Sequence, residues 1–303
     1  MTPDAETVTV NLQPATVNNV RPRLLVLAAA ILFSTGGAAI KATSLTAWQV
    51  ASFRSGIAAL AVLLMLRGAR RRPDRATWLV GVVYAATLVL FVFANKQTTA
   101  ANAIYLQGTA PLYILLAAPF LLREPVSRAD IAFMCALGLG LGAFFLGQEP
   151  ARQTAPNPAL GNMAALASGL TWAFTVMGLR WLGRRSEDPT ATQPSLVAGN
   201  VLACVLTLGL ALPVEHLPAR DLAILGFLGV FQIGLAYVCL VAGIRGVPAL
   251  ETSLLLLLEP VLSPIWAWLI HGEAPGNWAL VGGAIIMVAT TARTAWDARA
   301  STT

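Results

Sequence analysis

The chain has 303 residues, of which 57% are apolar and 11% are charged, and its formal net charge is +6. A soluble globular domain carries roughly 25% charged residues, so the composition excludes an ordinary soluble domain. The apolar residues form runs of about 20, which is the length that a helix needs to cross ~30 Å of hydrocarbon. The basic residues lie in short clusters between these runs, which indicates a membrane topology and not a nucleic-acid partner.

Residues 1–22 precede the first apolar run, and we expect them to form a cytoplasmic tail. They are polar and lack the basic start of a signal peptide. Ten runs follow, and each must be a helix because every backbone amide in hydrocarbon needs an internal partner. The predicted spans are 23–40, 46–66, 77–96, 99–122, 129–148, 159–181, 194–213, 220–243, 248–270 and 276–295. The sequence therefore predicts an all-α membrane protein with ten transmembrane helices.

The Lys and Arg residues are distributed unequally between the two sides of these spans. Fifteen of the 20 basic residues would lie on one side, and Arg54 lies inside the second span. The other side holds only Lys41, Lys96, Arg152 and Arg220. Basic residues accumulate in cytoplasmic loops, so this asymmetry predicts a multi-pass protein with both termini in the cytoplasm.

The two halves of the chain repeat each other. At an offset of 149 residues the matching pairs are Pro111 and Pro260, Glu124 and Glu273, Lys96 and Arg245, and Ala100 and Ala249. The first and sixth spans match at an offset of 139, which pairs Phe33 with Trp172. We therefore predict two five-helix repeats, at 23–150 and 158–297. Because five is odd, the second repeat must be inverted relative to the first, which is a common arrangement in secondary transporters.

Two charged side chains lie deep inside predicted spans, where a charge is costly unless it faces a partner or a cavity. Arg54 is either a contact for a substrate carboxylate or a structural residue that braces helices. Glu259 stands before Pro260, which we expect to kink the helix because proline lacks the amide hydrogen. Glu259 is either a cation or proton site or a structural carboxyl group. The sequence leaves both alternatives open.

Smaller polar and aromatic side chains inside the spans indicate a cavity between the halves. The candidate substrate-binding residues are Phe33, Thr35, Tyr84, Phe91, Asn95, Gln107, Trp172, Asn200 and Gln232. Three of them, Tyr84, Phe91 and Asn95, share one face of the third span with Thr87. Phe33 and Trp172 occupy matching positions and would form aromatic walls. Each amide could equally bond to a neighbouring helix.

Several short motifs carry a resemblance to a known family. They are Trp48-x-x-Ala51-x-x-Arg54, Ala110-Pro111 followed by Glu124-Pro125, Thr171-Trp172, Glu259-Pro260 and Glu273. With the helix count and the repeat, the chain resembles the drug/metabolite transporter superfamily, in its ten-helix branch of two EamA-type halves. It is most similar there to bacterial exporters of aromatic amino acids. The resemblance implies an inner-membrane location and export of amino acids or related metabolites.

The expected function is therefore a secondary transporter that exports amino acids, aromatic or otherwise apolar, by alternating access. The alternatives are a flippase for lipid-linked substrates and an intramembrane enzyme. An enzyme would need a nucleophile and a base in the spans, whereas the only histidines, His216 and His271, lie in predicted loops.

The expected partners are a small-molecule solute and the lipid bilayer, with the protein acting as a monomer or a weak homodimer. We expect no cofactor and no metal. The three cysteines, Cys135, Cys204 and Cys239, lie in apolar runs without the spacing of a metal site.

Overall fold

The computed structural model describes residues 20–121, 128–146, 151–188, 190–243, 247 and 255–300. The first half contains α1 (Val20–Ser34), α2 (Gly36–Ala42), α3 (Ala47–Met65), η1 (Arg67–Arg70), α4 (Arg75–Gln97), α5 (Ala100–Gln107), α6 (Ala110–Leu121) and α7 (Arg128–Leu146). The second contains α8 (Pro158–Arg184), α9 (Gln193–Ala211), α10 (Ala219–Gly226), η2 (Phe227–Leu235), α11 (Ala236–Gly243), α13 (Leu258–His271) and α14 (Asn277–Ala300). Within the described ranges the only β pairing is an isolated bridge between Arg152 and Ala155. The predicted all-α membrane fold is confirmed.

Six helical segments among the described residues are long and apolar enough to cross a membrane. They are Val20–Ala42, Ala47–Met65, Arg75–Gln97, Pro158–Arg184, Gln193–Ala211 and Ala219–Gly243. The fourth predicted span is divided into α5 and α6, and the described part of the ninth is mainly α13. Most of the predicted tail and Glu124 lie outside the described residues.

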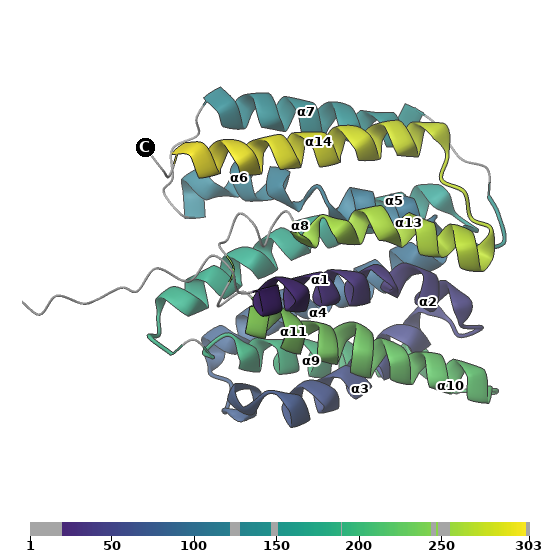
Figure 1. Ribbon diagram of the computed structural model, residues 1–303. Helices are drawn as coiled ribbons and strands as arrows, with labels where there is room; N and C mark the ends of the chain where they lie inside the picture. Colours follow the sequence, from purple (N-terminus) through teal and green to yellow (C-terminus); the bar gives the residue numbers. More distant parts are fainter. Residues whose placement is uncertain are drawn as a thin grey trace, which may run out of the picture.

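The helix packing follows the internal repeat. The contact of α4 with α8 has its counterpart in the contact of α11 with α1, and α6 with α8 corresponds to α13 with α1. Corresponding helices of the two halves also pack together, as α3 does with α9 and α7 with α14. In Figure 1 the start of α1 and the C-terminus both lie toward the left, as an even number of crossings requires. This is the packing of two interlocked, inverted five-helix repeats.

Small residues let the helices that surround the centre pack closely together. Gly81 and Gly199 bring α4 against α9, where a Cβ on Gly81 would lie 2.9 Å from the Ala198 Cβ. A Cβ on Gly229 would lie 2.6 Å from the Ile57 Cβ, so η2 also approaches α3 closely. Such contacts are the usual means of helix association in membranes, where hydrocarbon gives no hydrophobic drive.

Several helices are interrupted at the middle of the bundle. A turn at Thr35 separates α1 from α2, a break at Gly108 separates α5 from α6, and α13 begins after a turn at Leu257. Pro111 and Pro260 lie in the first turns of α6 and α13. The expected kink at Pro260 is therefore a helix start, because proline fits a first turn whose amides have no helical partner. In η2 the helix widens to a π-helix, a form that often marks functional sites.

Candidate functional site

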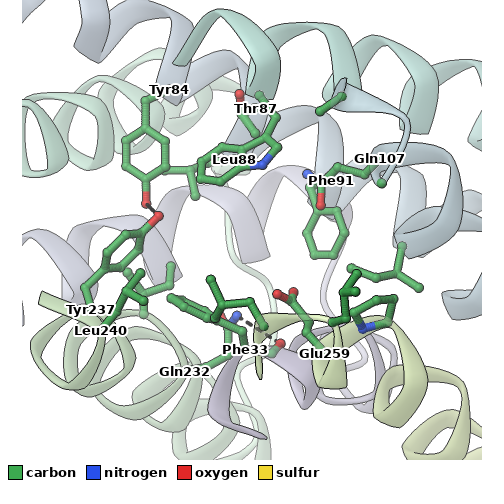
Figure 2. Close-up of a pocket in the computed structure, with 18 of the residues that line it drawn as sticks. Phe33, Tyr84, Thr87, Leu88, Phe91, Gln107, Gln232, Tyr237, Leu240 and Glu259 are labelled. Atoms are coloured by element: carbon green, nitrogen blue, oxygen red, sulfur yellow. Dashed lines mark hydrogen bonds between the residues drawn. The ribbon is translucent and has the colours of Figure 1, made fainter. Parts of the chain in front are cut away.

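A cavity of about 430 Å³ lies in the middle of the bundle, beside these helix interruptions. Its walls come from α1, α3, α4, α5 and α6 of the first half and from α8, η2, α11, α13 and α14 of the second. Figure 2 shows part of this wall, with side chains from both halves facing one another across an open space. The cavity therefore lies where the two repeats meet.

The lining residues correspond to each other across the repeat. At the offset of 149 the lining pairs are Tyr84 and Ile233, Leu88 and Tyr237, Phe91 and Leu240, Gln107 and Leu256, Gly108 and Leu257, Ala110 and Glu259, and Pro111 and Pro260. Phe33 and Trp172 form a further pair at the offset of 139. The cavity thus lies on the pseudo-twofold axis, which is where inverted-repeat transporters place their substrate sites.

Eight of the eleven predicted site residues line this cavity. They are Phe33, Arg54, Tyr84, Phe91, Gln107, Trp172, Gln232 and Glu259. The other three, Thr35, Asn95 and Asn200, do not line it and bond to their own helices. Thr35 Oγ1 donates to the Leu32 carbonyl at 2.6 Å. The Nδ2 groups of Asn95 and Asn200 each donate over 2.9 Å to the carbonyl four residues earlier.

Arg54 has the largest of the fully buried side chains and is only 1% exposed. Its Nε and Nη1 have no hydrogen-bond partner, and it forms no ion pair with any residue that the structure describes. The guanidinium lies in the electrostatic range of Tyr84 and Tyr237, whose hydroxyl groups lie 3.2 Å apart. Burying an unpaired charge is costly, so an anion in the cavity would satisfy this group.

Glu259 lies across the cavity from the two tyrosines. Figure 2 shows its carboxylate pointing into the open space, on the other side of which Tyr84 and Tyr237 lie. In the described part of the chain it forms no ion pair. It stands in the first turn of α13, where the helix dipole favours a negative charge. The cavity therefore presents an unpaired cation and an unpaired carboxyl group on different walls.

Aromatic rings form much of the remaining wall. The Phe33 ring packs edge-on against Tyr237 at a centroid distance of 5.2 Å. Tyr237 packs in the same way against Tyr84 at 6.3 Å. Trp172 and Phe91 also line the space. Such rings suit an apolar side chain of a solute, while the few polar groups fix its orientation.

The amides that the sequence left open have different partners. Gln107 Nε2 donates to Ser168 Oγ at 2.8 Å, which joins α5 to α8. Gln232 Nε2 donates to the Phe33 carbonyl at 3.5 Å, while its Oε1 is buried without a hydrogen-bond partner. Gln107 therefore makes an interhelical bond at the cavity wall, and Gln232 retains a free acceptor there.

Thr87, which shares the predicted face of Tyr84, also lines the cavity. Leu88, Tyr237 and Thr290 line it too and were not among the predicted residues. Tyr237 corresponds to Leu88 at the repeat offset, so projecting the third-span face onto the eighth span would have found it. No comparable signal in the sequence indicates Thr290. Among the described residues no cluster of three or more His, Cys, Asp or Glu side chains could hold a metal ion.

Comparison with known proteins agrees with this architecture. The EamA-like transporter family matches residues 21–146 and 159–292. The pseudopaline exporter CntI of Pseudomonas aeruginosa is 25% identical over 273 residues, which cover 88% of this chain and 93% of that protein. The uncharacterized transporter YyaM of Bacillus subtilis is 24% identical over 71% of this chain and 74% of its own.

A solved crystal structure has a similar fold. Its TM-score is 0.62 at 19% sequence identity, and the match covers 92% of this chain and 98% of the other. The two chains therefore share their overall fold. The chain belongs to the EamA-like transporter family and is a multi-pass membrane transporter.

Proposed function

We propose that the protein exports amino acids, mainly those with aromatic or other apolar side chains, or closely related small metabolites. The observation that carries this proposal is the unpaired, buried Arg54 in the same cavity as Glu259. The solute carboxylate binds Arg54 and its ammonium group lies toward Glu259. A zwitterionic amino acid thus supplies an anion for Arg54 and a cation for Glu259 while it carries no net charge itself.

The remaining wall accommodates the side chain of the solute. Phe33, Phe91 and Trp172 provide apolar, aromatic surface. A cavity of about 430 Å³ lies within the ~300–1,000 Å³ typical of small-molecule sites. This size favours a single amino acid or a compact derivative over a large lipid-linked solute.

Transport proceeds by alternating access, with the inverted repeats moving about the central cavity. The distribution of basic residues supports cytoplasmic termini in a bacterial inner membrane, and a relative that is named an exporter supports outward movement. Glu259 is the candidate proton carrier, because it is the carboxyl group that faces the cavity from within a span.

The flippase alternative has one observation in its favour. An apolar pocket lined by Leu27, Leu258, Val261 and Met287 shares Leu257 with the central cavity. An acyl chain would fit such a surface. The unpaired charges of the cavity favour the amino-acid proposal, because a hydrocarbon chain would leave them unsatisfied.

The test is transport by purified protein in liposomes. A panel of labelled amino acids is offered with and without a pH gradient, and phospholipid scrambling is measured in the same vesicles. We expect saturable movement of aromatic and branched amino acids and no scrambling. Scrambling without amino-acid transport would establish the flippase alternative, and movement of neither would overturn the proposed substrate class.

A further inference from the structure

A second group of buried charges lies at the end of the bundle away from the start of α1 and the end of α14, toward the right in Figure 1. We call it the α2 end, where α2 and α13 finish and α14 begins. Here Lys41 of the first half and Glu273 of the second form an ion pair at 3.1 Å between Nζ and Oε2. Both side chains are at most 2% exposed. The pair therefore joins the two repeats in a place that water does not reach.

Backbone groups complete the surroundings of this pair. Glu273 Oε1 accepts from the Ala100 amide at 2.5 Å. Lys41 Nζ donates to the Thr98 carbonyl at 2.7 Å and also to the Thr154 carbonyl. The pair thus fastens the ends of α2 and α13 to the start of α5 and to the segment before α8. A buried ion pair with this many hydrogen bonds is stable only while all of its members stay in place.

Further hydrogen bonds join α13 to the α1–α2 segment between this ion pair and the cavity. We call this contact surface of α13 with the α1–α2 segment the seam. His271 Nε2 lies 2.8 Å from the Ala38 carbonyl, and Trp266 Nε1 donates to Ser34 Oγ at 2.9 Å. Ser34 adjoins Phe33, which lines the cavity. Contacts between the α1–α2 segment and α13 therefore run from the cavity wall to Lys41 and Glu273 without interruption.

The seam is also tightly packed. A Cβ on Gly37 would lie 2.9 Å from Asn95 Oδ1, 3.1 Å from the Ala100 Cβ and 3.4 Å from Ser263 Oγ. This leaves no space for a solute between α2 and its neighbours. The helix interruption at Thr35 separates this packed α2 from α1, so α2 can move as a unit about that point.

The other described ion pairs have different positions. Arg71 and Asp188 are much more exposed, with side-chain exposures of 62% and 25%. Arg293 and Asp130 join α14 to α7, at 2.5 Å, and not across the seam between α2 and α13. Of the ion pairs in the described ranges, that of Lys41 and Glu273 alone joins α2 to the residues that follow α13.

We propose that Lys41 and Glu273 are the gate of the transporter at the α2 end. In this conformation the pair is closed and the cavity is shut off from that surface. The pair opens in each transport cycle, when α2 moves away from the end of α13 and the solute leaves. The inference goes beyond the proposed function, because the gate acts on any solute that the cavity holds.

The first test measures access to the cavity and needs no solute. In a variant whose three native cysteines are replaced, Phe33→Cys places a single thiol in the cavity wall. The rate at which this thiol reacts with a membrane-impermeant maleimide added on the α2 side measures access to the cavity. Lys41→Met or Glu273→Gln opens the gate, and we expect labelling to be at least about tenfold faster, as expected for a shift between two states. Lys41→Arg keeps the ion pair, and Asp130→Asn breaks the pair between α7 and α14; both should label as slowly as the parent.

A second measurement keeps the proposal testable if the charge variants do not fold. Ala38→Cys and His271→Cys, in the same background, place two thiols across the seam. Oxidation should stop transport and slow labelling of the cavity, and a reducing agent should restore both. Full transport by protein that is fully crosslinked would overturn the gate. So would unchanged labelling in folded Lys41→Met and Glu273→Gln. Failure of amino-acid transport alone would leave the labelling result intact.

Discussion

The two groups of buried charges in this transporter differ in their partners. In the central cavity, Arg54 and Glu259 form no ion pair within the described part of the chain. At the α2 end, Lys41 and Glu273 pair at 3.1 Å and bond to three backbone groups as well. Arg54 is as deeply buried as Lys41 and Glu273, so burial alone does not explain the difference.

The difference indicates two ways in which the free-energy cost of burying a charge is offset. At the α2 end the protein supplies the partner itself, and the interaction stabilises one closed conformation. In the cavity the partner is missing, and a charged solute can supply it. A buried charge that has every partner within the protein belongs to the conformational cycle, whereas one that faces a cavity without a partner belongs to solute recognition.

The largest effect is expected at Arg54. Arg54→Gln should reduce transport of carboxylate-bearing amino acids about 30-fold or more, since removing one partner of a buried charge pair costs ~2–5 kcal/mol. The measurement is counterflow in liposomes, with amines that lack a carboxylate as competing solutes. These amines should compete as well with the variant as with the parent protein.

Arg71→Gln provides the matched control, because Arg71 is an exposed arginine whose ion pair lies outside the cavity. It should transport like the parent. If Arg54→Gln also transported normally, Arg54 would belong with the structural charges, and the comparison between the two regions would fail.

Glu259→Gln should have the next largest effect, and on a different property. The variant should exchange labelled for unlabelled amino acid across the membrane but should not accumulate it in response to a pH gradient. The reason is that the amide cannot carry a proton. Glu187→Gln, at an exposed acid in the loop before α9, should accumulate normally. Full accumulation by Glu259→Gln would assign Glu259 to solute orientation only.

The sequence predicts the cavity charges better than it predicts the gate. Arg54 and Glu259 stand out because a charge within a long apolar run is rare and costly. Lys41 and Glu273 lie at the ends of predicted spans, where charged residues are ordinary. Their contact joins residues 232 positions apart, and only the folded arrangement of α2 and α13 brings them together.

The other predicted site residues divide in a similar way. Phe33 and Trp172 could be predicted from the internal repeat, because matching positions face a common axis. Asn95 and Asn200 could not be judged, because an amide inside a helix can bond to its own backbone or turn toward a neighbour. Tyr237 could have been found by projecting the face of Tyr84 onto the eighth span, but its counterpart at the repeat offset is the apolar Leu88, which gave no signal of its own.

A smaller effect is expected at the aromatic wall of the cavity. It concerns the choice between solute side chains and not the binding of the solute's charged groups. Trp172→Ala should lower the preference for aromatic over small amino acids by about tenfold, because aromatic contacts contribute ~0.5–1.5 kcal/mol beyond the burial of area. Competition between labelled and unlabelled amino acids measures this preference. Trp278→Ala, at a half-exposed tryptophan outside the cavity, should leave it unchanged. An equal loss for all amino acids would indicate a general packing defect.

The smallest effect concerns a charge that belongs to neither buried group. Asp74 is exposed and caps α4, where its Oδ1 accepts from the Thr77 hydroxyl at 2.6 Å and from the Thr77 amide at 2.7 Å. These hydrogen bonds hold the pKa of Asp74 below its usual value. The cap therefore stabilises α4 at neutral pH, and the stabilisation is lost as the pH falls through this lowered pKa.

Asp74→Ala should consequently lower the melting temperature of the purified protein by a few degrees at neutral pH, as loss of a helix cap does. The difference from the parent should shrink toward acid pH, whereas Asp74→Asn, which keeps an acceptor, should stay close to the parent at neutral pH. Transport should be unchanged in both variants, since neither the cavity nor the gate contains Asp74. A transport defect in Asp74→Ala without loss of stability would mean that exposed charges also control the cycle, and burial would no longer separate the functional charges from the others.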